Sequence, residues 1–205
     1  MILVLATENK DKGREIASII HEQIHVKDNL KIQLLSDYPN ITLPPETGNT
    51  YLQNATVKAT YVAKKVGQWA LGDDSGFEIF ALDGAPGLYS SRFAGEGVTY
   101  ADNRKKVLSL LIDVSEEKRL ARFVCTVVLA SPDGQVESFV GVCEGKIACS
   151  KTSDGNTGFG YDPIFYPAQY DKTFAECSSL EKNKISHRGH AVRAAIEMLI
   201  KKFAV

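Results

Sequence analysis

The chain has 205 residues, of which 44% are hydrophobic and 24% are charged, as in an ordinary water-soluble globular domain. Its 24 basic and 25 acidic residues leave a net charge of -1, whereas nucleic-acid backbones and anionic membranes favour strongly basic partners. No segment has the length of a membrane span or the pattern of a signal peptide, and the four cysteines form no C-x-x-C pair. These features predict a cytoplasmic protein that binds neither nucleic acid nor membrane, with one domain over residues 1–205.

The first half of the chain predicts a strand followed by a helix, and then the same pair again. Residues 2–6 are continuously apolar, as in a buried strand, and isoleucines then recur at helical spacing from Ile16 to Ile24. A second strand is predicted over residues 31–35. Residues 50–66 carry another apolar stripe at helical spacing, which predicts a second amphipathic helix.

The second half predicts long strands and two further helices. The expected elements are, in chain order, the strands "WALG" and "FEIFAL", a turn at "GAPG", a helix over 99–112, the strands "ARFVCTVVLA" and "QVESFVGVCEGKIACS" joined by the turn "SPDG", and a closing helix "HAVRAAIEMLIKKF". Mixed strand and helix signals with long antiparallel strands predict a mixed α/β domain, divided into two lobes around a cleft.

Two adjacent acids, Asp73 and Asp74, stand between two of these predicted strands. Neighbouring carboxylates repel each other, although acids at the end of a strand often do no more than cap a turn. A third acid, Glu46, lies in the loop "PPETGNT" just before the helix predicted over 50–66. A hard cation such as Mg²⁺ takes a few carboxylates and keeps its other positions for water and phosphate oxygens. Glu46 and Asp74 therefore predict a Mg²⁺ site if the fold brings them together.

The helix that follows Glu46 carries polar residues of its own. Thr50 is a candidate N-cap, since its hydroxyl can accept a hydrogen bond from an unpaired N–H of the first turn. Asn54 and Lys58 are four residues apart and therefore project together from one face of the helix.

The loop "TENKDK" joins the first predicted strand to the first predicted helix. A helix N-terminus offers N–H groups and the positive end of its dipole, and Lys10 and Lys12 add full positive charges. The loop is not a Walker A motif, and a solvated charged loop is the simpler reading of Lys10 alone. Together with a metal site, it predicts a phosphate-binding loop.

Two segments near the C-terminus suggest contacts to a nucleotide. In "GFGYDP", glycine allows close backbone approach and the rings of Phe159 and Tyr161 offer flat faces for a base, although a simple turn fits equally well. In "EKNKISHRGH", His187 and Arg188 stand just before the final predicted helix, where such a pair is usually solvated. With the acids and the phosphate loop, these segments predict binding of a nucleoside triphosphate with Mg²⁺.

Five segments, taken in chain order, resemble the inosine triphosphate pyrophosphatases, also called XTP/dITP diphosphatases. They are "ATENKDKGREI", "ETGNTYLQNATVKA", "GDDSGFEIFALDGAPGLYSSRFAGE", "GFGYDPIF" and "EKNKISHRGHA". The resemblance implies an elongated, two-lobed mixed α/β fold around a central mixed sheet, usually as a homodimer. It also implies Mg²⁺-dependent hydrolysis of ITP, dITP and XTP to the monophosphate and pyrophosphate, which clears deaminated purines from the nucleotide pool.

The resemblance implies a role for each matching residue. Glu46 and Asp74 would hold Mg²⁺, and Asp74 would also be the general base that orients or deprotonates water. Asp73, Asn54 and Lys58 would support them. Residues near the N-terminus would hold the triphosphate, and those near the C-terminus the base and sugar. The residues expected at the substrate are Thr7, Glu8, Asn9, Lys10, Asp11, Lys12, Ser75, Phe159, Gly160, Tyr161, Asp162, Lys182, His187 and Arg188.

The chain departs from the family pattern at two places. Glu8 stands where many members have a small or amide residue, and an acid there would repel phosphate unless it points away. Pro45 precedes Glu46 where many bacterial members have a second acid, which leaves Glu46 as the only acid of that loop to hold a metal.

Base selection depends on the 6-position of the purine. Hypoxanthine and xanthine carry an oxygen where adenine has an amino group, so N–H donors aimed at that oxygen would accept them and reject adenine. Candidate donors are the backbone N–H groups of residues 159–162 and 187–188. Two alternatives stay open: a pyrophosphatase for other modified nucleotides, such as modified pyrimidines or m7GTP, and a non-catalytic nucleotide-binding module.

Overall fold

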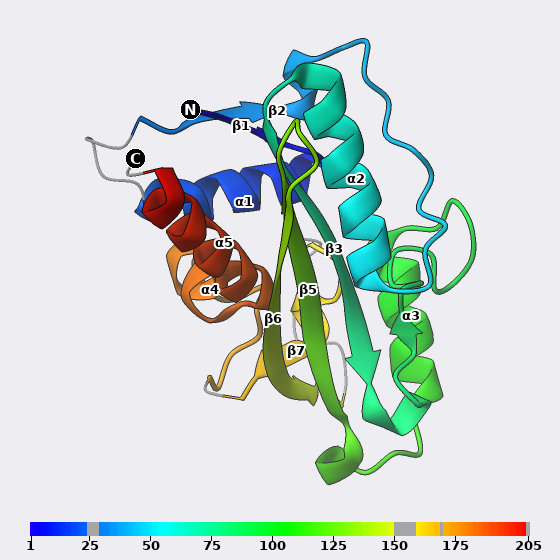
Figure 1. Cartoon of the computed structure of the whole chain (residues 1–205). Coiled ribbons are helices and arrows are strands. Elements are labelled where there is room, and N and C mark those ends of the chain that lie inside the picture. Colours follow the sequence, from blue (N-terminus) through cyan, green and yellow to red (C-terminus); the bar gives the residue numbers. More distant parts are fainter. Residues whose placement is uncertain (24–28, 150–158, 169, 204–205) are drawn as a thin grey trace. The chain divides into compact units, whose positions relative to one another are not determined.

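A computed structural model describes residues 1–23, 29–149, 159–168 and 170–203 (Figure 1). Its strands form one mixed sheet in the order β2-β1-β3-β5-β6-β7, and the short strand β4 pairs with β3. β1 runs parallel to β2 and to β3, whereas the β3–β4 and β6–β7 pairs are antiparallel. The mixed α/β class and the central mixed sheet are as predicted.

The chain divides into two compact units. The first unit comprises Met1–Asp74, Cys125–Gly141 and Ser186–Val205, and the second comprises Ser75–Val124 and Val142–Ile185. Three long strands, β3 (Trp69–Ile79), β5 (Leu120–Ala130) and β6 (Val136–Ile147), run from one unit into the other. One unit boundary falls between Asp74 and Ser75, directly after the acidic pair.

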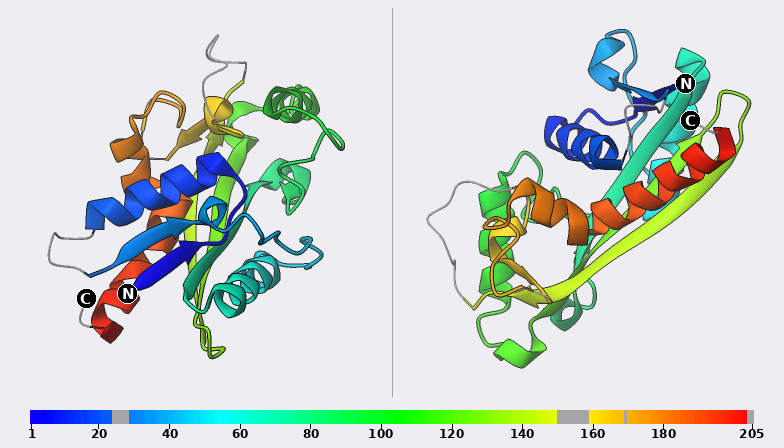
Figure 2. Two further views of the ribbon diagram at one scale, coloured as in Figure 1. Left: turned by 90° about the horizontal axis from the view of Figure 1, so that it is seen from above. Right: turned by 90° about the vertical axis from the view of Figure 1, so that its left-hand side faces the viewer.

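The first unit packs helices on both faces of its strands. Its remaining elements are β1 (Ile2–Leu5), α1 (Lys10–Gln23), β2 (Lys31–Leu34), the 3-10 turn η1 (Leu35–Asp37), α2 (Tyr51–Val66) and α5 (His187–Phe203). α1 and α5 lie side by side and bury Ile16 and Ala195 against Leu71 of β3 (Figure 2). α2 buries Ala55 and Ala59 on the opposite face, against Ala70 of β3.

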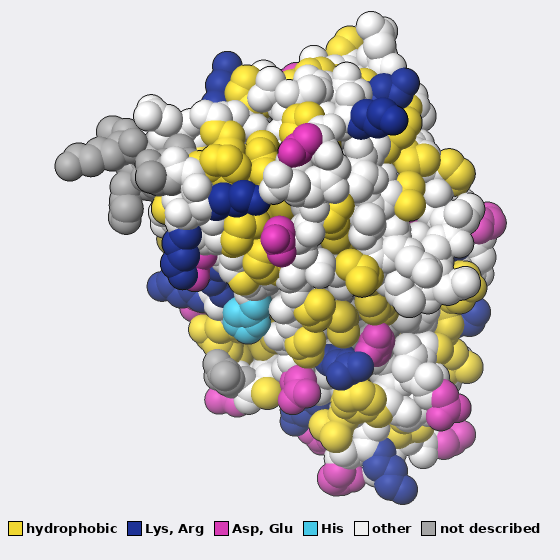
Figure 3. All heavy atoms as spheres, viewed as in Figure 1, with side chains coloured by type: hydrophobic (Ala, Val, Ile, Leu, Met, Phe, Trp, Pro, Cys, Tyr) yellow, Lys and Arg dark blue, Asp and Glu magenta, His cyan; other side chains and the backbone are white. Residues whose placement is uncertain are grey.

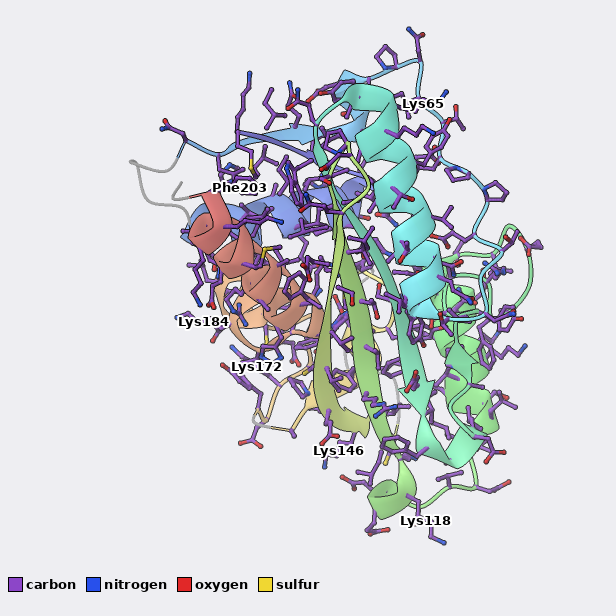
Figure 4. All side chains as sticks on the ribbon, viewed as in Figure 1. Lys65, Lys118, Lys146, Lys172, Lys184 and Phe203 are labelled. Carbon is purple, nitrogen blue, oxygen red and sulfur yellow. The ribbon has the colours of Figure 1, made fainter. Side chains whose placement is uncertain are left out.

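Close packing of α2 on β3 depends on Gly72. A Cβ atom at this position would lie 2.5 Å from the carbonyl oxygen of Ala55, so any larger residue would push the helix off the strand. At its far end α2 carries Lys64 and Lys65, the latter labelled in Figure 4, which suits the negative end of the helix dipole. Phe203, also labelled, ends α5 and meets the ring of Trp69 edge-on at 5.4 Å.

The second unit has a core of its own. Its remaining elements are the 3-10 turns η2 (Phe80–Leu82), η3 (Glu116–Lys118) and η4 (Asp162–Ile164), the strands β4 (Pro86–Gly87) and β7 (Phe165–Pro167), and the helices α3 (Tyr100–Leu110) and α4 (Ser179–Ile185). Aromatic rings dominate its core, where Phe77, Phe123, Phe165 and Phe174 pack with Tyr161. These ring pairs bury large apolar areas in a small volume.

Most predicted elements are confirmed. The strand over residues 2–6 is β1, and the helix over 50–66 is α2 with Thr50 as its N-cap, since the Thr50 hydroxyl accepts a hydrogen bond from the Gln53 N–H at 3.1 Å. The two long β segments are β5 and β6. Their joining turn is closed by the Gly134 N–H, which donates to the Ser131 carbonyl at 3.1 Å.

Two predictions about the site segments were wrong. "WALG" and "FEIFAL" are not separate strands, because β3 is continuous and carries both acids. His187 and Arg188 do not precede the final helix; they are its first two residues. In both places charged residues favoured an interruption of the element, as a turn cap at Asp73 and Asp74 and as a solvated helix start at His187 and Arg188. In the folded chain Asp73, Asp74 and Arg188 have partners. Of the other predicted residues, Ile24 and the first glycine of "GFGYDP" lie outside the described residues.

None of the helices in the described ranges is long and apolar enough to cross a bilayer. On the face shown in Figure 3, acidic and basic side chains are interspersed and form no continuous basic patch. This distribution agrees with the near-neutral net charge of the chain.

Candidate active site

Asn54 on the first turns of α2 joins the Glu46 loop to Asp74. Its side-chain oxygen accepts a hydrogen bond from the Gly48 N–H at 2.8 Å, and its amide nitrogen donates to Asp74 Oδ2 at 2.9 Å. Both oxygen and nitrogen of one buried amide are therefore used, each toward a different segment. The bridge places the loop that carries Glu46 beside the strand that carries Asp74.

Lys58, one turn further along α2, lies among three carboxylates. Its Nζ donates to Glu46 Oε1 at 2.5 Å, and its side chain is only 6% exposed. Burial lowers the pKa of Lys58, but the charges of Asp73, Glu46 and Asp74 outweigh it and raise the pKa above its ordinary value. Lys58 is therefore fully charged at neutral pH. The prediction that Asn54 and Lys58 project together is confirmed, since both meet the Glu46–Asp74 region.

Asp74 is the less well compensated of the two adjacent acids. Burial raises its pKa above the ordinary value, and nearby Glu46 adds to this, whereas Lys58 and the Asn54 hydrogen bond only partly offset it. Two carboxylates that share one lysine retain excess negative charge. A further cation placed between them would lower the pKa of Asp74 and stabilise the site.

Asp73 points to the other face of the sheet, because side chains alternate along a strand. Its Oδ2 lies 3.2 Å from Lys12 Nζ and 3.6 Å from Arg188 Nε, and the side chain is 1% exposed. Burial alone would raise its pKa, but the charges of Lys12, Arg188 and Lys58 outweigh this and lower the pKa well below its usual range. Asp73 is thus a fixed negative charge that holds two cations from distant segments.

Arg188 is held in place by two acids. Its Nη1 donates to Glu15 Oε2 of α1 at 2.6 Å, and its Nε faces Asp73, with the side chain 2% exposed. Glu15 was not among the predicted site residues. Only a contact between residues 173 positions apart reveals it, and its sole sequence signal is an acid on the polar face of the first helix.

The loop at the start of α1 is organised by Asn9. Its side-chain oxygen accepts hydrogen bonds from the N–H groups of Asp11 and Lys12, at 3.0 and 3.1 Å. The sequence predicted free N–H groups at this helix N-terminus; the structure corrects this, because the Asn9 cap already uses two of them. The loop borders a cavity of about 440 Å³ that is lined by Thr7 to Lys10 and by residues of β2 and η1.

The Glu8 side chain is bound to a neighbouring backbone segment. Its Oε1 accepts a hydrogen bond from the Leu43 N–H at 3.1 Å. The carboxylate thereby ties the strand-to-helix loop to the segment that leads to Glu46.

The site offers two carboxylates to a metal ion. Among the described residues, no group of three or more His, Cys, Asp or Glu side chains converges in a way that would hold a metal by itself. Two neighbouring carboxylates, one of them 40% exposed, match the usual case in which Mg²⁺ takes one or two protein oxygens and completes its shell with phosphate and water. Glu46 and Asp74 therefore fit Mg²⁺ that arrives with a phosphorylated substrate, and do not form a closed metal cage.

The predicted base-binding segment lies in the second unit. Phe159 and Gly160 are half-buried, and the ring of Phe159 packs edge-on against Tyr100 at 5.1 Å. Tyr161 is 3% exposed and stacks on Phe77 at 4.7 Å. The prediction that the Tyr161 ring offers a face to a base is wrong, because that ring belongs to the aromatic core.

Asp162 and Lys182 pair with each other in the same unit. Lys182 Nζ donates to Asp162 Oδ2 at 2.7 Å, with both side chains largely buried. The predicted site residues are thus brought together as two groups: the acids, Asn54, Lys58, Lys12 and Arg188 in the first unit, and residues 159–162 with Lys182 in the second. Ser75 follows Asp74 directly in β3 and is half-buried, and His187 is buried at the start of α5.

The chain is similar to known proteins over nearly its whole length. The model of the Ham1 family matches residues 3–198. A dITP/XTP pyrophosphatase of Desulforamulus reducens is 44% identical over 199 residues, which covers 97% of this chain and 96% of that protein. One of Halalkalibacterium halodurans is 44% identical over 190 residues, with 93% and 94% covered.

Solved structures extend the likeness to the fold. The Staphylococcus aureus Ham1 protein superposes with a TM-score of 0.82 at 35% identity, covering 98% of this chain and all of that one. A HAM1 protein from Coxiella burnetii gives 0.84 at 36% identity, covering 98% and 99%.

Proposed function

The chain belongs to the Ham1 family, and from this premise we propose that it hydrolyses deaminated purine nucleoside triphosphates to the monophosphate and pyrophosphate. The proposed substrates are dITP, ITP and XTP. The observation that carries the proposal is the Glu46–Asp74 pair, which Asn54 and Lys58 hold together on the α2 face of β3. Relatives that cover almost the whole chain and are named dITP/XTP pyrophosphatases support it.

We infer that Glu46 and Asp74 hold Mg²⁺ together with the substrate. Bound there, Mg²⁺ would neutralise charge on the phosphates as the leaving pyrophosphate forms. A triphosphate carries several negative charges, and two carboxylates would repel it without a cation between them. The charges of the site therefore support a dependence on a divalent cation.

The residues of the chain take separate roles in this reaction. Lys12 and Lys10 would bind the triphosphate, with Thr7 beside them, while Asp73 keeps Lys12 in place from the buried side. Asp74 would orient the water that attacks the α-phosphorus in line. Because a neighbouring cation lowers the pKa of a carboxyl, Asp74 would act mainly as a ligand and an orienting acceptor. Lys58 would hold Glu46 in position.

Recognition of the base would fall to residues 159–162 and 187–188. An N–H group aimed at the 6-oxygen accepts hypoxanthine and xanthine, whereas the adenine amino group would face it with a second donor. A pyrophosphatase for other modified nucleotides would share the acids and differ only in these segments. The experiment must therefore separate the reaction from the choice of base.

Pyrophosphate release from dITP, XTP, dATP, dGTP and dTTP, each with and without Mg²⁺, tests the proposal. We expect Mg²⁺-dependent release from dITP and XTP and little from the other three. Equal rates on all five would keep the hydrolase and refute the selectivity. No release from any of them would refute the proposed reaction and favour a nucleotide-binding module.

We also propose that the protein is a homodimer that acts on the nucleotide pool of the cytoplasm. The resemblance to the family supports the dimer. Light scattering at micromolar concentration tests it, and a mass that corresponds to one chain alone would refute it.

A further inference from the structure

The loop of residues 159–162 makes a tight turn in the second unit. The Asp162 N–H donates to the Phe159 carbonyl at 3.2 Å, and Gly160 at the turn has a φ of +59°. This left-handed conformation is favourable for glycine and costly for almost any other residue. The loop therefore has one well-defined shape, in which the direction of each peptide group is set by its neighbours.

The C-terminal side of this loop is anchored in the core. The Tyr161 hydroxyl donates to the Ser90 carbonyl at 2.8 Å while its ring stacks on Phe77. Asp162 is fixed by its pair with Lys182. These contacts hold the side chains after Gly160, but none of them is made by the peptide group between Gly160 and Tyr161.

Helix α3 supplies the missing contact. Arg104 Nη1 donates to the Gly160 carbonyl at 2.7 Å, and Tyr100, four residues earlier, places its ring against Phe159. Residues four apart lie on one face of a helix, so α3 presents both groups to the loop. α3 is itself fixed at its start by a capping box between Thr99 and Asp102.

The buried position of Arg104 is energetically unfavourable for a residue whose only role would be to add stability. It is 6% exposed, and a buried guanidinium costs several kcal/mol unless its charge is compensated. Asp162 supplies part of that compensation. The hydrogen bond of Arg104 goes to a single backbone carbonyl at the turn, which is the one atom that decides the direction of the adjoining N–H.

In a trans peptide group the carbonyl and the N–H point in opposite directions. Since the Gly160 carbonyl points to Arg104, the Tyr161 N–H points away from α3. That N–H makes no hydrogen bond to any residue that the structure describes. We propose that Arg104 is a positioning residue for base recognition, which keeps the Tyr161 N–H directed at the oxygen of a 6-oxopurine. This inference rests on the proposed function and adds a residue to it.

The role of Arg104 has a consequence that a purely structural role lacks. Without the guanidinium, no side chain of α3 holds the Gly160 carbonyl, and the Tyr161 N–H is directed less firmly at the purine oxygen. A donor that is held less firmly discriminates less between the oxygen of hypoxanthine and the amino group of adenine. Loss of Arg104 should therefore lower kcat/KM for dITP. The value of kcat/KM for dATP should rise relative to that for dITP.

The test compares kcat/KM for dITP and dATP in Arg104→Met, Arg104→Lys and Tyr100→Leu. In Arg104→Met the ratio of the two values should fall about tenfold, the worth of one hydrogen bond. Lysine can still donate to the carbonyl, so Arg104→Lys should lie between this variant and the wild type. Tyr100→Leu loosens only the Phe159 side and should lower the ratio least.

Arg119 provides the matched control. It is also buried in the second unit, at 4% exposed, and donates to the carbonyls of Val114, Ala148 and Leu111, which lie outside the loop. Arg119→Met should lower the free energy of unfolding in urea and leave the dITP to dATP ratio unchanged.

The outcomes separate the two proposals. A wild-type protein that does not hydrolyse dITP refutes the proposed function before any variant is compared. An active wild type with an unchanged ratio in folded Arg104→Met overturns the role of Arg104 alone. If Arg104→Met does not fold, Arg104→Lys and Tyr100→Leu decide in the same way: a lowered ratio supports the role, and a wild-type ratio in both overturns it.

Discussion

The two faces of β3 give the neighbouring acids opposite surroundings. On the face of α1 and α5, Asp73 is 1% exposed and meets Lys12 and Arg188. On the face of α2, Asp74 accepts a hydrogen bond from Asn54 and shares Lys58 with the exposed acid Glu46. The pKa of Asp73 is lowered, whereas that of Asp74 is raised.

Under the proposed mechanism, one residue type serves stability and chemistry at adjacent positions. A carboxylate whose charge is matched by neighbouring cations stabilises the fold and does not attract a further cation. A carboxylate whose charge is incompletely matched favours an incoming cation. Substitutions at the two positions should therefore have opposite consequences.

The largest expected effect is on turnover in Asp74→Asn. Asparagine has the same size and can still accept from Asn54, but it removes the charge proposed to hold Mg²⁺ and orient water. We expect kcat for dITP to fall on the order of 10³-fold, with no loss in the free energy of unfolding. Steady-state kinetics and urea unfolding measure the two. Near-normal turnover with intact Mg²⁺ binding would remove Asp74 from the proposed mechanism.

Asp73→Asn should show the reverse pattern, with the main loss in stability. It leaves the buried Arg188 and the partly buried Lys12 beside a neutral amide, which should lower the free energy of unfolding by about 3 kcal/mol. Asp11→Asn is the control, since Asp11 pairs with Arg14 at the surface and should change stability by less than about 0.5 kcal/mol. Equal losses in the two variants would show that the buried pairs do not hold this face together.

The pH dependence of stability should also differ between the two acids. The lowered pKa of Asp73 contributes stability above the unfolded value of about 3.9, and this is lost as the pH falls through the folded pKa. The stabilities of wild type and Asp73→Asn should therefore begin to converge as the pH falls below about 4. The raised pKa of Asp74 has the opposite effect on stability. The free energy of unfolding of Asp74→Asn should therefore increase relative to that of the wild type as the pH rises from about 4. Urea unfolding in metal-free buffers at several pH values tests both, and parallel curves for all three proteins would contradict them.

The smallest effect is expected at Glu8. Because its carboxylate accepts from the Leu43 N–H, Glu8→Gln keeps an acceptor there and should leave KM for dITP within about twofold of the wild type. A clear fall in KM would mean that the carboxylate faces the phosphates in solution and repels them.

The sequence predicted those parts of the fold that depend on local pattern. The apolar run of β1, the cap and stripe of α2, and the turn between β5 and β6 are all found where spacing and turn chemistry indicated. The family, too, followed from the order of short motifs. Neither inference requires knowledge of which residues meet across the fold.

The site was predicted as a set of residues, but not as an arrangement. β3 was divided in two because adjacent acids look unfavourable within a sheet. They are favourable here only because Lys12, Lys58 and Arg188 arrive from three other elements. Glu15 and Arg104 were missed for the same reason, since their contacts, to Arg188 and to Gly160, span long distances in the chain.

The sequence by itself therefore determined the family, the order of the elements and the residue types of the site, because each of these follows from local patterns and motif order. What only the tertiary structure decided is which acid is neutralised by its partners and which retains excess negative charge. It also decided that Glu8 faces Leu43 and that Tyr161 lies in the core. The physical reason is that the energy of a buried charge depends on its nearest partners in space, and those partners are set by packing between distant segments.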